Sequence, residues 1–364
     1  MKWSWKIASY KGIDVFIHAT FLLIIAWVGI SYWQQTRTLA GTLEGILFTV
    51  FLFGCVVLHE FGHALTAQRY GVKTRDITLY PIGGVARLER MPDKPIQEFW
   101  VALAGPAVNV VIAALLFGWL LISGTLAPFG SLGLTVGPFI ERLMLVNVSL
   151  VLFNMIPAFP MDGGRVLRAL LAMRMEYTRA TQIAASIGQG LAFLFGFIGL
   201  FFNPLLLFIA FFVWIGAAQE ASMVQMKSAL GGIPVRRATI TDFQTISPSD
   251  TLERAVELIL AGSQNDFPVE MDGAVVGVLT RNDVLAALSR QERSAPVASL
   301  MRRDFQSADA NEMLELAFAR LQTCGCHSMP VTYQGKLVGL LTNDNVGEFL
   351  MVQSAMRKAQ GGAV

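Results

Sequence analysis

The chain has 364 residues, of which 54% are hydrophobic and only 15% are charged. Soluble domains carry roughly 25% charged residues, so the composition excludes an ordinary soluble enzyme, and the apolar content excludes a disordered chain. Residues 231–364 hold 15 of the 26 acidic and 12 of the 28 basic side chains, which indicates a membrane-embedded first part followed by a soluble domain. A net charge of +2 gives no case for nucleic-acid binding, and 3 cysteines cannot make a disulfide framework.

Six apolar runs are long enough to cross about 30 Å of hydrocarbon. They lie at residues 14–33, 43–67, 98–123, 141–161, 181–200 and 203–220. Lys and Arg gather before the first run and in the loops after the second and fourth runs, while the alternate loops hold few of them. By the positive-inside rule, both termini and the soluble domain are expected in the cytosol. The sequence therefore predicts a multi-pass α-helical protein of the cell membrane.

Residues 74–92 form a different kind of element between the second and third runs. Ile77 and Leu79 are typical of a strand, Pro81–Gly84 is a turn signal, and Val85–Leu88 alternates again. This pattern predicts a short β-hairpin. At membrane depth such a hairpin must be buried in protein or line a wet cavity, which makes it re-entrant; a hairpin on the cytosolic surface is the alternative.

The last third of the chain repeats itself. Residues 268–283 (PVEMDGAVVGVLTRND) align with residues 330–345 (PVTYQGKLVGLLTNDN) at an offset of 62 positions. An amphipathic helix pattern precedes each copy, at 251–261 and 311–322. Internal repetition of this kind predicts two copies of one β-α-β-type unit that bury their faces against each other.

His59-Glu60-Phe61-Gly62-His63 lies inside the second apolar run. Residues four apart share a helical face, so both imidazoles can reach one metal ion such as Zn²⁺. Glu60 directly follows the first imidazole, where its carboxylate can act as general base toward a water molecule. The alternative is two buried histidines bonded to neighbouring helices. Ionisable groups inside a spanning helix are costly and usually functional, which favours the metal site.

A catalytic zinc ion takes three protein ligands and keeps an open position for water. Of the 4 histidines, His327 lies in the repeat, and His18 in the first run is expected to be a packed or interfacial residue. The third ligand is therefore expected to be a carboxylate. Asp162 is preferred because it closes the fourth run just after two prolines, which interrupt the helix and let the side chain point inward. Glu220, at the end of the sixth run, is the alternative.

His59–His63 together with Asn154-x-x-Pro157-x-x-Pro160-x-Asp162-Gly163-Gly164 resembles the site-2 protease family of intramembrane zinc metalloproteases. The resemblance covers about residues 1–220. Ala104-Gly105-Pro106 and Asn109 in the third run also match segments typical of that family. The resemblance implies one Zn²⁺ held by His59, His63 and Asp162, with Glu60 as the general base. It also implies that Asn154 is a polar helper at the site, and that the hairpin around Gly83 and Gly84 presents an edge to an extended substrate.

The C-terminal repeat resembles a tandem pair of cystathionine-β-synthase (CBS) domains, and no PDZ-like insertion separates the second and third runs. The resemblance implies a regulatory adenine nucleotide (ATP, ADP or AMP) at Thr280 and Asp283. The corresponding residues of the second copy are Thr342 and Asn345, where Asn replaces the more usual Asp and predicts a weaker site. A purely structural, dimerising module is the alternative. Metal binding at Cys324–His327 is disfavoured, because three donors in four adjacent residues make a poor zinc geometry.

The predicted architecture is six transmembrane helices with a re-entrant β-hairpin, followed by a soluble α/β tandem CBS pair. The expected boundaries are a protease core at 1–220, a linker at 221–237, CBS domains at 238–290 and 291–350, and a tail at 351–364. The predicted function is hydrolysis of membrane-anchored protein substrates within or near their transmembrane helices, modulated by nucleotide, with a homodimer through the CBS domains as a further expectation. A CBS-regulated channel or a zinc transporter is the alternative.

Overall fold

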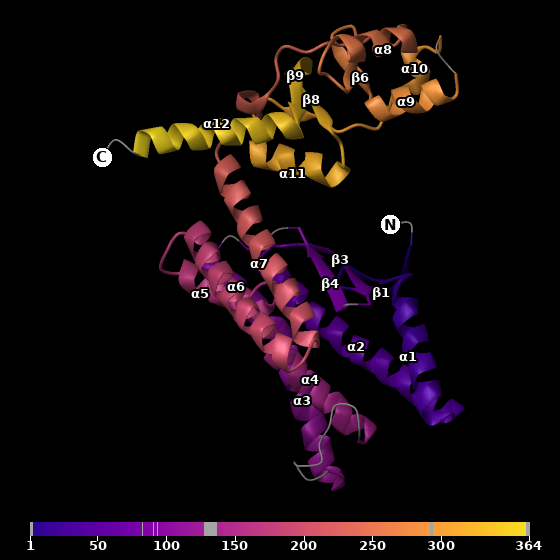
Figure 1. Cartoon of the computed structure of the whole chain (residues 1–364), viewed down its shortest axis with the longest axis vertical. Helices are drawn as coiled ribbons and strands as arrows, with labels where there is room; N and C mark the ends of the chain where they lie inside the picture. The colour runs from indigo at the N-terminus through magenta and orange to yellow at the C-terminus, as the bar shows by residue number, and fades with distance from the viewer. Residues whose placement is uncertain are drawn as a thin grey trace. The chain divides into compact units, whose positions relative to one another are not determined.

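The computed structural model describes residues 3–81, 83–89, 91–92, 94–126, 137–291 and 294–361 (Figure 1). The chain divides into two compact units, Met1–Val224 and Gln225–Val364, referred to below as unit 1 and unit 2. Unit 1 combines a small β-sheet with a set of long helices, whereas unit 2 consists of two small α/β repeats.

The sheet of unit 1 has four strands among the described residues. These are β1 (Ser4–Tyr10), β2 (Ile13–His18), β3 (Thr74–Tyr80) and β4 (Gly83–Leu88), which pair in that order. β1 with β2 and β3 with β4 form antiparallel hairpins, while β2 and β3 run parallel with Val15 opposite Ile77. The hairpin predicted for residues 74–92 is therefore present as β3 and β4, and β4 lies at an edge of the sheet.

The prediction that the first transmembrane helix starts at residue 14 is wrong. Residues 13–18 form strand β2, and helix begins only at Phe21. Lys11 and Gly12 have φ angles of 49° and 80°, the left-handed pair that a two-residue hairpin requires. Ile13, at the start of β2, packs in a buried cluster with Ile77 of β3. The strand was missed because its alternating buried side chains directly precede the apolar helix, so the two together read as one continuous apolar run.

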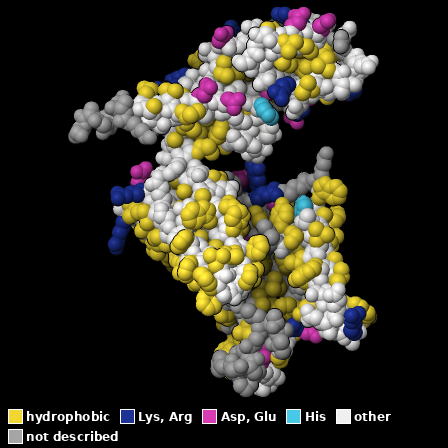
Figure 2. Space-filling view, in the orientation of Figure 1, with side chains coloured by type: hydrophobic (Ala, Val, Ile, Leu, Met, Phe, Trp, Pro, Cys, Tyr) yellow, Lys and Arg dark blue, Asp and Glu magenta, His cyan; other side chains and the backbone are white. Residues whose placement is uncertain are grey.

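Seven helices of the described chain begin in unit 1. They are α1 (Phe21–Thr36), α2 (Leu39–Arg69), α3 (Pro95–Ser123), α4 (Phe139–Asn154), α5 (Asp162–Ala172), α6 (Tyr177–Phe201) and α7 (Leu205–Leu230). α6 and α7 are separated by Phe202-Asn203-Pro204, which confirms the predicted break at this point. Large hydrophobic side chains are exposed over these helices, as Figure 2 shows for one face of the molecule, and this is the surface expected of helices that contact lipid.

Four of the described helices, α2, α3, α6 and α7, are long and apolar enough to cross a membrane. The first and fourth predicted spans correspond to the 16-residue helices α1 and α4. At 1.5 Å per residue each extends only about 24 Å, less than the hydrocarbon thickness. The fourth span was predicted to reach residue 161, but α4 ends at Asn154 and residues 155–161 form turns that contain Pro157 and Pro160.

Unit 2 contains the two predicted repeats. Its described elements are the 3-10 helix η2 (Val235–Ala238), α8 (Leu252–Ala261), β5 (Phe267–Met271), β6 (Ala274–Leu279), α9 (Arg281–Ser289), α10 (Val297–Leu300), β7 (Ala308–Asp309), α11 (Leu314–Cys324), β8 (Ser328–Tyr333), β9 (Lys336–Thr342) and α12 (Asn343–Gly361). One core surrounds Phe267 and Leu279 of the first repeat, and another surrounds Met329 and Leu341 of the second. The repeated hydrophobic pattern thus gives two similar cores within one unit.

The segment predicted as a linker, residues 221–237, is helical over its first part. α7 continues to Leu230 because no glycine or proline occurs between Gly216 and Gly231-Gly232. Leu230, Ile233 and Val235 then enter the core of the second repeat. The C-terminal end of α7 is therefore part of the hydrophobic core of unit 2.

Candidate functional site

Three buried side chains from two helices converge in unit 1. His59 and His63 lie one turn apart on α2, and Asp162 is the first residue of α5. The two Nε2 atoms are 3.1 Å apart, and each lies 3.2 Å from Oδ2 of Asp162. The structure brings Asp162, and not Glu220, to the imidazoles; Glu220 instead accepts a hydrogen bond from Arg168.

The second nitrogen of each imidazole is held by an oxygen from α3. Nδ1 of His63 donates to the backbone carbonyl of Val101 at 2.7 Å, and Nδ1 of His59 donates to Oδ1 of Asn109 at 2.5 Å. Asn109 in turn donates through Nδ2 to Oδ1 of Asn147 on α4, at 2.7 Å. Because these oxygens accept, the proton stays on Nδ1 and the Nε2 lone pairs face Asp162.

Asn147 is a residue of the site that the sequence analysis missed, and Asn109 was noted there without a role. Both side chains are fully buried. The available signal was a polar amide inside an apolar run, which is expensive unless it is hydrogen-bonded. The hydrogen bond between Asn109 and Asn147 joins α3 to α4, so the sequence could indicate a buried polar contact without identifying this partner.

Small residues let the surrounding backbone approach the histidines. A Cβ atom on Gly105 of α3 would lie 2.2 Å from Nε2 of His63 and 2.7 Å from Nε2 of His59. A Cβ atom on Gly163, next to Asp162, would lie 2.4 Å from the carbonyl oxygen of Ile156. Any side chain at these positions would displace either a ligand-type atom or the turn that leads into α5.

The hairpin lies next to the proposed base. Glu60 is half-buried, and a Cβ atom on Gly84 would lie 3.0 Å from Cγ of Glu60. Gly83 and Gly84 open β4, which is the edge strand of the sheet. The structure thus brings the predicted hairpin residues to the carboxylate between the two histidines.

Two other predicted residues have less direct relations to this centre. Asn154 is the last residue of α4 and is half-buried, and no hydrogen bond joins its side chain to His59, His63 or Asp162 in the described part of the chain. His18 ends β2, where Nδ1 lies 2.8 Å from the Thr20 hydroxyl and the ring packs on Tyr80 at 5.1 Å. His18 thus packs against Tyr80 at the end of β2.

The donor set fits a zinc ion. Two imidazole nitrogens and one carboxylate oxygen are the ligands of many catalytic zinc sites. Hydrogen bonds from the non-coordinating nitrogen to carbonyl oxygens are the usual support for such ligands. The three donor atoms already lie within 3.2 Å of one another, so one ion can be shared without rearrangement of the helices.

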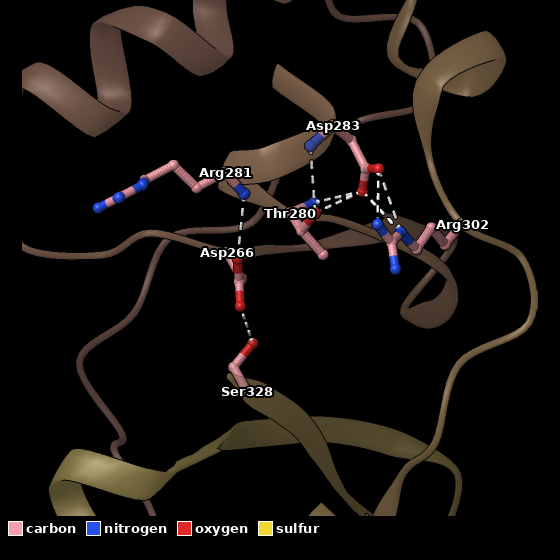
Figure 3. A network of polar contacts seen from close by, with 6 residues as sticks. All are labelled: Asp266, Thr280, Arg281, Asp283, Arg302 and Ser328. Carbon is pink, nitrogen blue, oxygen red and sulfur yellow. Dashed lines mark hydrogen bonds and ion pairs between the residues drawn. The ribbon is translucent and has the colours of Figure 1, made fainter. Parts of the chain in front are cut away.

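A second candidate site lies in unit 2 at the start of α9 (Figure 3). Thr280 caps the helix, and its hydroxyl donates to Oδ2 of Asp283 at 2.5 Å. Arg302 binds the same carboxylate with two nitrogens, Nε to Oδ2 and Nη2 to Oδ1, both at 2.9 Å. Burial alone would raise the pKa of Asp283, but the hydrogen bonds from Arg302 and Thr280 hold that pKa below its ordinary value.

These residues border a cavity of about 220 Å³ between the two repeats. Thr280 lines it from the first repeat, and Arg302 and residues 324–328 line it from the second. Asp266 joins the repeats, since its carboxylate accepts the backbone N–H of Arg281 at 3.1 Å and the hydroxyl of Ser328 at 3.0 Å. The cavity is smaller than the roughly 300–1,000 Å³ typical of ligand sites, so a nucleotide would have to widen it.

The corresponding residues of the second repeat are engaged differently. The side-chain amide of Asn345 donates to the backbone carbonyl of Ala238 at 2.6 Å, and Thr342 accepts the backbone N–H of Asn345 at 3.1 Å. Neither residue lines the cavity described above. Cys324 and Cys326 are joined by a disulfide, which leaves no free thiolate for the disfavoured metal site at residues 324–327.

The fold and the buried donor set define a membrane-embedded metallopeptidase with a tandem regulatory-type module. Comparison with known proteins agrees. The sequence profile described as Peptidase family M50 matches residues 47–135 and 130–195, and the CBS domain profile matches residues 235–290 and 297–351. Zinc metalloprotease MJ0392 of Methanocaldococcus jannaschii is 30% identical over 348 residues, which cover 95% of this chain and 96% of that protein. The chain therefore belongs to peptidase family M50, the site-2 protease family of zinc metalloproteases, and carries two CBS domains.

Two further proteins are similar to this chain. Stage IV sporulation protein FB of Bacillus subtilis is 22% identical over 283 residues, covering 75% of this chain and 91% of that protein. The solved site-2 protease from Methanocaldococcus jannaschii is 38% identical and covers 60% of this chain and 95% of that chain, with a TM-score of 0.44. The family assignment makes the chain a multi-pass zinc metalloprotease of the intramembrane type and leaves the channel and transporter alternatives without support.

Proposed function

We propose that this chain hydrolyses peptide bonds within or near the transmembrane helices of membrane-anchored proteins, using one zinc ion held by His59, His63 and Asp162. The observation that carries the proposal is the convergence of two Nε2 atoms and Oδ2 of Asp162 within 3.2 Å, from positions 99 residues apart in the chain. The carbonyl oxygens of Val101 and Asn109 support it, because they leave both Nε2 lone pairs available to a metal.

Bound zinc would supply a Lewis acid that makes water nucleophilic near neutral pH and polarises the scissile carbonyl. Glu60 accepts the proton of the attacking water and passes it to the leaving amine. Its position directly after His59, beside the hairpin, places this carboxylate between the metal ligands and the edge strand. Burial of the three ligands excludes bulk water and strengthens the electrostatic interactions at the site.

The edge of β4 is proposed as the substrate-binding element. A helical substrate hides its backbone groups in i→i−4 hydrogen bonds, so it must unwind before hydrolysis. An extended segment can recover those bonds by adding to an exposed strand. Gly83 and Gly84 carry no side chain that would separate such a segment from Glu60, and Asn154 is proposed to hydrogen-bond the substrate backbone or the oxyanion.

Unit 2 is proposed to sense an adenine nucleotide, ATP, ADP or AMP, chiefly at Thr280 and Asp283. The cavity that Thr280 lines between the repeats supports this assignment. Thr342 and Asn345 are proposed as a weaker site, because Asn345 already donates to a backbone carbonyl. Both termini and unit 2 are proposed to be cytosolic from the distribution of Lys and Arg, and the CBS pair is proposed to mediate homodimerisation.

The direct test is metal analysis combined with cleavage by the purified full-length protein in detergent. One zinc per chain, and cleavage of a co-purified single-span substrate that stops with a chelator and returns with added zinc, are expected. Absence of bound zinc, or cleavage that survives complete removal of the metal, would contradict the proposal.

A further inference from the structure

A buried ion cluster lies on the helix that supplies Asp162. Arg168, on α5, is 0% exposed, and its partner Glu98 on α3 is 1% exposed. Nε of Arg168 donates to Oε1 of Glu98 at 2.8 Å, and Nη2 donates to the same oxygen at 2.5 Å. Nη1 donates to Oε1 of Glu220 on α7, also at 2.5 Å. One guanidinium therefore joins three helices.

Two aromatic rings pack against this guanidinium. Cζ of Arg168 lies 5.0 Å from the centroid of Phe159 and 5.1 Å from that of Tyr177. Phe159 belongs to the turn that leads into α5, and Tyr177 begins α6. A buried charge with this many partners is expensive to move, because any displacement leaves one of them uncompensated.

The cluster acts on the same two helices that form the metal centre. α3 orients both imidazoles, through the carbonyl of Val101 and the amide of Asn109, and it also carries Glu98. α5 carries Asp162 and, six residues later, Arg168, a separation of about 9 Å along the helix axis. The Arg168–Glu98 pair thus fixes the helix of the carboxylate ligand against the helix that orients the histidines.

We infer that Arg168 is a positioning residue for the third metal ligand. Through Glu98 and Glu220 it holds α5, and with it the Asp162 carboxylate, at the place where the carboxylate shares one metal ion with His59 and His63. This inference rests on the proposed ligand set. Glu220 makes the placement of Asp162 depend also on α7, although Glu220 itself is not a ligand.

The test compares zinc affinity among variants of the full-length protein in detergent, by competition with a chelator. Arg168→Lys keeps the charge and most of the side-chain volume but loses the planar fork that serves two carboxylates, so its zinc Kd should rise at least tenfold. Glu220→Gln, a milder change at a side chain 28% exposed, should raise the zinc Kd about threefold or more. Arg174→Lys is the matched control: Arg174 is exposed just beyond α5, and its zinc Kd should stay within about twofold of wild type.

A second readout reports the geometry of the site. The visible absorption of the Co²⁺-substituted protein depends on the arrangement of the ligands, so Arg168→Lys should change the band shape while Arg174→Lys should not. Wild-type zinc affinity and a wild-type Co²⁺ spectrum in both Arg168→Lys and Glu220→Gln would overturn the inference, even if cleavage falls. If Arg168→Lys does not fold, the zinc Kd and the Co²⁺ spectrum of Glu220→Gln decide whether the inference holds.

Asp162→Ala separates this inference from the proposal on which it rests. Loss of zinc in Asp162→Ala together with unchanged zinc binding in the Arg168 and Glu220 variants would overturn only the positioning role. Retention of wild-type zinc affinity in Asp162→Ala would show instead that the ligand assignment is wrong, and the positioning role would be overturned with it.

Discussion

Each histidine of the metal centre lies on α2 and is oriented by an oxygen atom from α3. His63 depends on a backbone carbonyl, which no substitution can remove, whereas His59 depends on the Asn109 side chain, which is itself oriented by Asn147. The two imidazoles therefore differ in their sensitivity to mutation. Side chains that only orient a ligand are expected to affect metal binding before they affect the fold.

Glu60→Gln is expected to abolish cleavage while zinc remains bound. The amide keeps the size of the carboxylate but cannot accept a proton, and general-base catalysis contributes about 10²–10⁴-fold to the rate. Cleavage of a co-expressed single-span substrate and zinc content of the purified protein are the measurements. A variant that expresses normally and cleaves like wild type would rule out Glu60 as the base.

Asn109→Leu is expected to raise the zinc Kd about 10- to 100-fold, because His59 loses the acceptor that fixes its tautomer. Asn147→Leu should have a smaller effect, since it acts on His59 only through Asn109. Chelator competition measures both affinities. A larger rise in the zinc Kd for Asn147→Leu than for Asn109→Leu would contradict the proposal that Asn147 acts on His59 through Asn109.

The sequence predicted the three donor residues that the structure brings together, but not all of the residues that orient them. His59, Glu60 and His63 lie within five residues, so helical periodicity alone places both imidazoles on one face. Asp162 could be selected because it ends an apolar run after two prolines. Asn147 could not be selected, because its importance depends on the tertiary contact of α4 with α3 and no local pattern encodes that contact.

At the scale of elements, short strands were harder to predict than long helices. The hairpin of β3 and β4 and the break between α6 and α7 followed from turn residues and proline. Strand β2 was missed because it directly precedes the apolar helix α1, so that strand and helix merge into one run of spanning length. The sheet also depends on pairing between residues 13–18 and 74–80, which are distant in sequence.

Gly105→Ala is expected to disrupt the metal centre through the contact between α2 and α3. Its Cβ would lie 2.2 Å from Nε2 of His63, so either the imidazole or α3 must move. Overpacking of this kind costs roughly 1–3 kcal/mol of stability. Zinc content and the thermal unfolding midpoint should both fall.

Gly118→Ala is the matched control on the same helix, because among the described residues no atom outside its own stretch of helix lies within 4 Å of the Cβ it would add. Replacing glycine by alanine in a helix interior gains about 1 kcal/mol in helix propensity, so zinc content should be unchanged and stability unchanged or higher. Equal loss of zinc in Gly105→Ala and Gly118→Ala would show that helix propensity, not the approach to His63, decides the outcome.

At the scale of the whole molecule, α7 begins in unit 1 and ends in unit 2. Glu220 on α7 contacts Arg168 within unit 1, and Leu230 at the end of α7 lies in the hydrophobic core of the second repeat in unit 2. Regulation of cleavage by a nucleotide bound to unit 2 would require coupling between the two units. Such coupling requires a nucleotide that binds two states of the protein with different affinity, and coupling of about 1–3 kcal/mol is typical.

The nucleotide sites of the two repeats are expected to be unequal. Thr280 lines the cavity between the repeats, with Asp283 bound to its hydroxyl, whereas Asn345 is committed to the carbonyl of Ala238. Combined Thr280→Ala and Asp283→Ala should thus weaken binding of AMP, ADP or ATP at least tenfold more than combined Thr342→Ala and Asn345→Ala. Titration calorimetry of the full-length protein measures both. The two double variants are matched, because each removes the hydrogen bond between a threonine hydroxyl and a backbone N–H at the start of a helix.

The expected affinity is modest, because Arg302 already occupies the Asp283 carboxylate with two hydrogen bonds at 2.9 Å. A ribose hydroxyl that donates to Asp283 must share or displace this arginine, and the phosphate of the same nucleotide can then accept from the released guanidinium. Wild-type protein should therefore bind AMP more tightly than adenosine, and Arg302→Gln should reduce that preference. If wild type and Arg302→Gln show the same ratio of AMP to adenosine affinity, Arg302 does not contact the phosphate. If neither ligand binds to the wild-type protein at millimolar concentration, unit 2 is a structural or dimerising module. The protease assignment is unaffected by that result.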